Sequence, residues 1–387
     1  MPQFPGTIKS KLPKVGTTIF TTMTALANED NAINLSQGFP DFEVNDKLKS
    51  LVTQYINTNN NQYAPMAGVA KLRESIAEKI EKLYSTNYNP DTEITITAGG
   101  TMALYSAISA IVNDGDEVVI FTPAYDSYTP AVQLNGGIPI YIPLKAADFS
   151  IPWDMVKKFI NHRTRLIILN NPHNPTGATL SEDDVKQLQH ILQGTEIMVL
   201  SDEVYEHLVF DGKQHESICR YPALAERSFV VFSFGKTYNA TGWKVGYCVA
   251  PEILMKEFRK VHQYQTFSVN TPMQLALADY MEENSAYLQL AAFYEEKRNF
   301  FLRQLSGSKF DIKPAKGTYF QLLGYQNISE EKDTDLAIRL IKEFGVAAIP
   351  VSVFYHKPFD SKYLRFCFAK ENNTLTQAAE RLLKFAS

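Results

Sequence analysis

The sequence predicts an α/β protein with a large domain, in which a mostly parallel sheet lies between layers of helices, and a smaller α+β domain. Strands and helical segments alternate from about residue 93 to residue 234. Several of these strands are apolar at every position, which is typical of parallel strands covered on both faces. Beyond about residue 284 the pattern changes to a long helical segment and short strands, so we expect the second domain there.

Residues 1–44 are expected to form an irregular N-terminal arm and part of the smaller domain, since prolines recur along this stretch. A helix is expected from about Met66, because apolar residues then fall on one helical face. These residues are Val69, Leu72, Ile76, Ile80 and Leu83.

The large domain is expected to span residues 45–283. Ser181 is a good N-cap for a helix over residues 181–193, because its hydroxyl can accept a hydrogen bond from the first turn. The expected strands read "EITITA", "DEVVIF", "RLIILN", "EIMVLSD" and "FVVFSF", and a buried helix, "TMALYSAISAIV", follows the first of them.

The smaller domain is expected to span residues 284–387. It begins with a long helix over residues 285–305 and ends with a helix over residues 374–386. Between them lie the expected strands "GTYFQLL", "VAAIPV" and "YLRFCFA".

Composition excludes several classes of protein. The 387 residues suffice for about two domains, and 45% hydrophobic with 21% charged residues fits a soluble globular protein. A net charge of -4, with both signs mixed along the chain, argues against a nucleic-acid binder. No apolar run approaches the roughly 20 residues of a membrane span, and no signal peptide is visible. A cytoplasmic protein is expected.

The cysteines and histidines indicate neither a disulfide framework nor a metal site. Cys219, Cys248 and Cys367 are far apart and form no CxxC pair, which fits a reducing compartment. No histidine pair has ligand spacing, and no GxGxxG suggests a dinucleotide site.

Polar or glycine-rich residues follow each expected strand, where parallel sheets bind ligands. Gly99, Gly100 and Thr101 at a helix N-terminus could bind phosphate, although an ordinary tight turn has the same pattern. Asp202 ends an apolar strand and could have a role in a binding site. A helix cap or a buried carboxylate with hydrogen-bond partners is the alternative. Lys236 follows another strand, where partial burial would free its amine as a nucleophile. A surface lysine is the alternative.

Taken together, these features suit pyridoxal phosphate (PLP). This cofactor needs a phosphate cradle, a lysine amine for its aldehyde, and a carboxylate beside its ring nitrogen so that the ring can withdraw electrons. The sequence therefore predicts a PLP enzyme.

Motifs over nearly the whole chain support this prediction through a resemblance. They include "INLSQGFPDF", "NQYAPMAGVAKLRESIA", "NNPHNPTG", "SDEVYEHLVF", "SFGKTYNATGWKVGY" and "YLRFCFAK". In this order they resemble the fold type I PLP-dependent aminotransferases of class I, in the branch of kynurenine and glutamine transaminases. "KVHQYQTFSVNTP" and "GVAAIPVSVFY" are similar to bacterial methionine aminotransferases. The resemblance implies amino transfer from an amino acid to a 2-oxo acid, in a homodimer with shared active sites.

The resemblance also implies roles for single residues. Lys236 resembles the lysine that binds PLP and then carries the substrate proton. Asp202 resembles the carboxylate that pairs with the ring nitrogen of the cofactor. Tyr205 and Asn174 resemble the residues that donate to the cofactor's phenolate oxygen. Tyr125 resembles the aromatic residue that stacks on the pyridine ring. Further cofactor contacts are implied for Gly100, Thr101, Met102, Ser233, Lys244 and, from the second subunit, Tyr63.

Arg365 resembles the arginine that binds the substrate carboxylate. Strand alternation in "YLRFCFA" places it opposite Leu364 and Phe366, and a planar guanidinium suits a carboxylate. An exposed strand arginine is the alternative. Asn174 and the backbone of Gly38 would complete this site. The implied side-chain contacts indicate a large neutral amino acid, although each fits core packing equally well: Ile19, Phe20, Phe39, Tyr63, Tyr125, Phe354 and, from the second subunit, Phe267.

Other activities stay open at this point. Kynurenine is one alternative donor, but Ser268 stands where some kynurenine-processing relatives carry histidine. The same site could also catalyse β-elimination from cysteine S-conjugates. A PLP-sensing half of a transcription regulator is disfavoured, because the N-terminal segment has no helix-turn-helix pattern. A structural protein that only retains the fold is disfavoured by the complete catalytic set.

Overall fold

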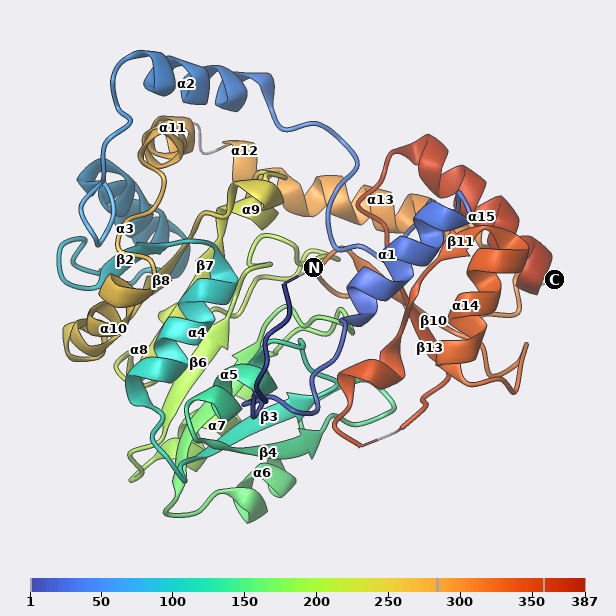
Figure 1. Cartoon of the computed structure of the whole chain (residues 1–387), viewed down its shortest axis with the longest axis horizontal. Helices are drawn as coiled ribbons and strands as arrows, with labels where there is room; N and C mark the ends of the chain where they lie inside the picture. The colour runs from blue at the N-terminus through green and yellow to red at the C-terminus, as the bar shows by residue number, and fades with distance from the viewer. Residues whose placement is uncertain (1, 283–284, 358, 387) are drawn as a thin grey trace.

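The computed structural model describes residues 2–282, 285–357 and 359–386. A seven-stranded sheet forms the centre of its larger part, in the order β2-β8-β7-β6-β5-β3-β4 (Figure 1). The strands from β4 to β7 in this order run parallel, and β8 runs antiparallel to both neighbours. The predicted mostly parallel sheet is confirmed. Its strands are β2 (Ile94–Thr97), β3 (Glu117–Thr122), β4 (Ile138–Pro143), β5 (Thr164–Asn170), β6 (Met198–Asp202), β7 (Ser228–Ser233) and β8 (Gly246–Val249).

Helices cover both faces of this sheet. In β3, Val118 and Ile120 belong to one core with residues of α4, α5 and α10, whereas Val119 and Phe121 belong to the other with residues of α3 and α7. Burial on both faces explains why the strand is apolar at successive positions. The helices of this part are α3 (Ala70–Tyr84), α4 (Gly100–Ile111), α5 (Tyr128–Leu134), α6 (Trp153–Phe159), α7 (Glu182–Leu192), α8 (Pro222–Ala225), α10 (Glu252–Gln265) and α11 (Thr271–Met281).

Two strands and one capping interaction test the local predictions. Ser181 caps α7 as predicted, and its Oγ accepts from the backbone N–H of Asp184 at 3.2 Å. The strands β4 and β8 were not predicted. β4 is mostly half-buried or exposed, and β8 is short and begins with glycine, so neither shows the apolar run of a central strand.

The N-terminal segment is more regular than predicted. The expectation of irregular structure over residues 1–44 is wrong for α1 (Ile19–Glu29) and β1 (Ile33–Asn34), which lie between the prolines of this segment. β1 pairs in parallel with β11 (Val346–Ala347), and Figure 1 shows α1 in blue beside the orange and red C-terminal elements. A further unpredicted helix, α2 (Asp46–Asn57), precedes α3 and packs on α11.

The C-terminal part contains a four-stranded antiparallel sheet in the order β12-β13-β10-β9. The predicted long helix is two helices, α12 and α13. The predicted domain boundary, between residues 283 and 284, lies outside the described residues, so the division of the chain into domains stays a prediction. The elements are α12 (Ser285–Leu288), α13 (Leu290–Gln304), β9 (Asp311–Ile312), β10 (Phe320–Gly324), α14 (Asp333–Phe344), β12 (Ile349–Pro350), β13 (Tyr363–Cys367) and α15 (Asn372–Ala386). Among the helices in the described ranges, none is both long and apolar enough to cross a membrane.

Candidate active site

A cavity of about 380 Å³ lies at the carboxyl ends of the parallel strands, where they meet the N-terminal segment and the small sheet. Most of the residues predicted for the site line it, although they span the sequence from the first helix to β13. They are Phe20, Gly38, Phe39, Gly100, Thr101, Tyr125, Asn174, Asp202, Tyr205, Ser233, Lys236, Lys244 and Arg365.

Lys236 lies on α9 (Phe234–Thr237), a single turn that directly follows β7. Its amine donates hydrogen bonds to the Gly38 carbonyl at 3.0 Å and to the Tyr319 hydroxyl at 2.8 Å. Burial lowers the pKa of the Lys236 amine to about 8, and nearby cations act in the same direction. More of this amine is therefore unprotonated at neutral pH than of an ordinary lysine, as a nucleophile requires.

Asp202 is the last residue of β6 and is 3% exposed. The Tyr128 hydroxyl donates to its Oδ2 at 2.6 Å, and the backbone N–H of Val204 donates to its Oδ1 at 3.3 Å. Burial raises the pKa of Asp202 to about 6, although both hydrogen bonds act in the opposite direction. A carboxylate that is buried in this way favours a cationic partner, because burying a charge without an opposite charge costs free energy.

The turn before α4 forms a cradle for an anion. Gly99 has a φ of +80°, and a Cβ at this position would lie 3.2 Å from the Lys244 Nζ. The Lys244 ammonium therefore lies close to the N-terminus of α4, where free N–H groups and the helix dipole also favour an anion. Thr101 and Ser233 add hydroxyl groups to the same cavity wall.

Arg365 lies on β13 and is 1% exposed, which excludes the exposed strand arginine considered above. It donates to Asn174 Oδ1 at 2.7 Å and to the Ser36 carbonyl at 2.9 Å, and its guanidinium carbon lies 3.9 Å from the centroid of the Phe320 ring. Both acceptors are neutral, and Arg365 Nε has no hydrogen-bond partner among the described residues. Burial lowers the pKa of Arg365 to about 10. This buried cation suits an incoming carboxylate.

Several residues predicted for the site do not line this cavity. Tyr63 is 81% exposed and packs edge-on against Phe267, with ring centroids 5.2 Å apart. Both are predicted to reach the active site of a second subunit, and this stays a prediction. Phe354 is buried behind the cavity, 5.5 Å from the Arg365 guanidinium carbon. Met102 does not reach the cavity either.

Other residues at the site were missed in the sequence. Tyr319 and Phe320 follow each other in "GTYFQLL", which was interpreted only as a strand. Tyr128 ends the stretch "TPAYDSY", which follows the expected strand "DEVVIF", and Asn170 ends "RLIILN". Asn170 Oδ1 accepts from the backbone N–H of Asn174 at 2.7 Å. Asn170 offered a signal because it ends a strand, whereas Tyr319 lies directly before β10 and Tyr128 begins α5. No local pattern distinguishes a hydroxyl that contacts a lysine from one that faces solvent.

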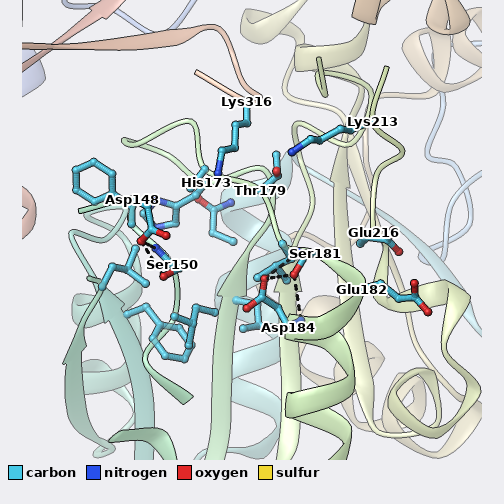
Figure 2. Close-up of a pocket in the computed structure, with 18 of the residues that line it drawn as sticks. Asp148, Ser150, His173, Thr179, Ser181, Glu182, Asp184, Lys213, Glu216 and Lys316 are labelled. Atoms are coloured by element: carbon cyan, nitrogen blue, oxygen red, sulfur yellow. Dashed lines mark hydrogen bonds between the residues drawn. The ribbon is translucent and has the colours of Figure 1, made fainter. Parts of the chain in front are cut away.

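A larger cavity, of about 570 Å³, lies next to the first and shares Asn170 with it (Figure 2). Its His173 has a pKa lowered to about 4 by burial, and the His173 Nδ1 lies 2.7 Å from Thr176 Oγ1. Lys213 and Lys316 are exposed. Its carboxylates already have partners within the chain: Asp148 with Ser150, Asp184 with Ser181, and Glu216 with Tyr221. The smaller cavity is therefore the candidate active site.

No group of three or more histidine, cysteine, aspartate or glutamate side chains in the described ranges could hold a metal ion. The candidate site combines an amine of lowered pKa, a buried carboxylate, an anion cradle and a buried guanidinium, at the carboxyl edge of a mostly parallel α/β sheet. This fold and this site are those of an aminotransferase of fold type I.

Comparisons with known proteins agree with this class. Residues 30–382 match the family model "Aminotransferase class I and II", and the chain belongs to this family. It is 51% identical to a methionine aminotransferase of Escherichia coli (strain K12), over 97% of both chains. It is 32% identical to human kynurenine–oxoglutarate transaminase 1, over 93% of this chain and 94% of that protein.

Solved structures show the same similarity. A structure from Escherichia coli, described as having a methionine aminotransferase function, matches with a TM-score of 0.97 and 50% identity, over 98% of this chain and all of that one. The N-succinyldiaminopimelate aminotransferase of Mycobacterium tuberculosis matches with a TM-score of 0.94 and 34% identity, also over 98% of this chain and all of that one.

Proposed function

We propose that this aminotransferase uses PLP to move the amino group of a large neutral amino acid, with methionine as a preferred donor, to a 2-oxo acid. The observation that carries the proposal is that one cavity is lined by the Lys236 amine, the Asp202 carboxylate and the Arg365 guanidinium. When bound, PLP supplies an aldehyde that links to amines and a ring that withdraws electrons from the substrate Cα.

The residues of the large sheet fit this cofactor. The cradle fits its phosphate, and the buried Asp202 fits its protonated ring nitrogen. The half-buried Tyr125 offers a ring for stacking. The proposed phosphate contacts are Gly100, Thr101, Ser233 and Lys244.

Tyr205 and Asn174 are suited to hold the cofactor's phenolate oxygen. Burial raises the pKa of the Tyr205 hydroxyl above its ordinary value, so it stays a hydrogen-bond donor at neutral pH. Asn174 Oδ1 accepts from Arg365, which leaves its amide NH₂ free to donate towards the cavity.

Lys236 is the residue proposed to move protons. With its pKa lowered to about 8, its amine can accept the α-proton of the substrate and later donate a proton at neutral pH. The same property makes it the amine to which the cofactor attaches.

Arg365, with Asn174 and the backbone of Gly38, is proposed to bind the α-carboxylate of the substrate. Phe20, Phe39 and Phe320 line the same cavity and offer neutral contacts to the substrate side chain. Among the described residues, the cations that line the cavity are Lys236, Lys244 and Arg365, and each already has a role in this scheme. This lining offers no further cation to a second carboxylate, as in aspartate. This favours a large neutral donor.

The similarity to a methionine aminotransferase over nearly the whole chain supports methionine as donor. Kynurenine is the second candidate, since kynurenine transaminases are also similar over nearly the whole chain, at lower identity.

We further propose a homodimer with shared active sites. Tyr63 and Phe267, whose rings pack edge-on, are 81% and 49% exposed and form an apolar surface on the large domain. Such a surface suits burial against a second copy, which would bring these residues to the partner's site. The free, buried cysteines fit the reducing cytoplasm, where we place the reaction.

A donor panel tests the proposal. The purified protein is incubated with PLP and treated with borohydride, and Lys236 is expected to carry the trapped cofactor. With several 2-oxo acids, methionine is expected to outperform aspartate clearly. A preference for aspartate would contradict the proposed specificity, and kynurenine in first place would favour the second candidate. Pyruvate and ammonia formed from a cysteine S-conjugate without an acceptor would indicate β-elimination.

A further inference from the structure

The Tyr319 hydroxyl is one of two groups that hold the Lys236 amine. Lys236 donates to it at 2.8 Å and to the Gly38 carbonyl at 3.0 Å. The three residues come from separate segments: Lys236 from α9, Gly38 from the segment after β1, and Tyr319 from the position before β10. The contact therefore joins the lysine of the large sheet to the other part of the molecule.

The direction of these hydrogen bonds defines what Tyr319 can do. Its hydroxyl donates its single proton to the Gly38 carbonyl, so it meets Lys236 as an acceptor. Tyr319 is fully buried, and burial raises its pKa well above the ordinary value, so the hydroxyl stays neutral. An acceptor binds an ammonium more strongly than a neutral amine, so this contact favours the protonated form of Lys236.

Packing holds the Tyr319 ring in place without the lysine. Its centroid lies 5.1 Å from that of Tyr205 and 5.8 Å from that of Tyr294. The Lys236 Nζ lies 5.4 Å from the Tyr319 ring and 5.6 Å from the Tyr205 ring, where aromatic rings attract a cation. The amine therefore lies in a preformed setting of one hydroxyl, one carbonyl and two rings.

We propose that Tyr319 is a positioning residue for Lys236: its hydroxyl, with the Gly38 carbonyl, holds the lysine amine whenever it has no covalent bond to a cofactor, and stabilises its protonated form. This rests on the proposed function, in which the amine is released during each turnover. Without this contact, burial alone would lower the proton affinity of the amine further, and the amine would no longer be held in one place for proton transfer.

The test measures the protonation of Lys236 in the PLP-free protein. Trace acetylation with acetic anhydride over a range of pH values, followed by mass spectrometry, gives the midpoint at which Lys236 becomes reactive. In Tyr319→Phe this midpoint is expected to fall by about 0.5–1 pH unit, because a hydrogen bond to the ammonium is lost. A midpoint equal to that of the unmodified protein would overturn the proposal.

Tyr294→Phe is the matched control. Its ring packs on Tyr319, but its hydroxyl donates to Asn239 Oδ1 at 2.7 Å and not to the lysine. Its midpoint is expected to match the unmodified protein, and an equal shift in both variants would overturn the proposal by indicating a general packing effect. If Tyr319→Phe does not fold, 3-fluorotyrosine placed at position 319 weakens the acceptor without removing it. An unchanged midpoint there also overturns the proposal.

A second readout uses the PLP-loaded protein. In this protein the Lys236 amine is free only during turnover, so kcat is expected to fall in Tyr319→Phe by a larger factor than KM rises, and not to fall in Tyr294→Phe. An unchanged kcat in Tyr319→Phe would overturn the proposal. If the unmodified protein binds no PLP at Lys236, the proposed function fails. The acetylation experiment still shows whether the Tyr319 hydroxyl stabilises the protonated form of Lys236.

Discussion

The two neighbouring cavities differ in how deeply their charged groups are buried. The larger one, shown in Figure 2, has carboxylates that already bond to serine or tyrosine hydroxyls of the chain, and its lysines are exposed. The smaller one holds a buried guanidinium whose acceptors are neutral and whose Nε has no hydrogen-bond partner in the part of the chain that the structure describes. It also holds a buried carboxylate of raised pKa and an amine of lowered pKa.

Size therefore does not identify the site in this molecule. Burying charged groups without charged partners costs folding free energy, so groups held in this way are candidates for binding a ligand that supplies the missing charges. The carboxylates Asp148, Asp184 and Glu216 of the larger cavity are exposed or half-buried, so water reaches them and no such requirement arises. The comparison predicts large effects for changes in the smaller cavity and small effects for matched changes in the larger one.

The largest effect is expected for Lys236→Ala. Removing the amine removes both the attachment point and the proton carrier, so kcat/KM should fall by about 10⁴-fold or more. A steady-state assay with methionine and a 2-oxo acid measures this, with Lys213→Ala from the larger cavity as the matched control. Comparable losses in both variants would contradict the assignment of the site.

Asp202→Asn should lower kcat/KM by about 10³-fold, because the ring nitrogen loses its anionic partner. Asp148→Asn in the larger cavity is the matched control and should retain activity. Retained activity in Asp202→Asn would exclude Asp202 as the partner of the cofactor ring.

The same substitution should stabilise the PLP-free protein. The folded-state pKa of Asp202 is about 6, above its ordinary value of 3.8, so the folded state binds this proton more tightly than the unfolded state does. The carboxyl therefore destabilises the fold as pH rises from about 4 to 6, by about 1–3 kcal/mol at neutral pH. Thermal unfolding of both proteins between pH 4 and pH 7 should show a difference that grows over this range. A constant difference would contradict the raised pKa.

Arg365→Ala should raise the KM for methionine by about 10²-fold, because a charge-assisted contact to the substrate carboxylate is lost. PLP should stay bound, since the proposed cofactor contacts lie on the large sheet. The absorbance of bound PLP and the KM together measure this. An unchanged KM would remove Arg365 from the substrate site.

The smallest effects are expected in the larger cavity. Lys213→Ala and Lys316→Ala remove exposed lysines, and each should change kcat/KM by less than about 2-fold, as surface substitutions generally have small effects. A loss of 10-fold or more in either variant would mean that the two cavities act together.

The sequence predicted the elements whose pattern is local. The buried strands β3, β5, β6 and β7 showed continuous apolar runs, and Ser181 showed its cap. The helix α1 was missed, because its segment carries flanking prolines and only Met23 and Ala27 are buried in it. The strand β1 was missed too, because its partner β11 lies more than 300 residues away in the chain, beyond the reach of any local pattern.

In the site, Lys236, Asp202 and the glycine turn before α4 could be predicted from the sequence, because each directly follows or ends an expected strand. Parallel strands end at one edge of a sheet, so these residues were expected to lie together. The contacts made by these residues required the folded chain. Tyr319 contacts Lys236 and Tyr128 contacts Asp202 because distant segments pack together. The same packing leaves the Arg365 Nε without a hydrogen-bond partner within residues 2–282, 285–357 and 359–386.

The sequence by itself thus determined the fold class, through periodicity along the chain, and the identity of the charged groups, through residue type. The family followed from the resemblance of its ordered motifs. The tertiary structure alone decided which of those charges are satisfied, which of two adjacent cavities holds the chemistry, and how far each pKa moves. Those properties depend on burial and on distances between segments, and neither is set by local sequence.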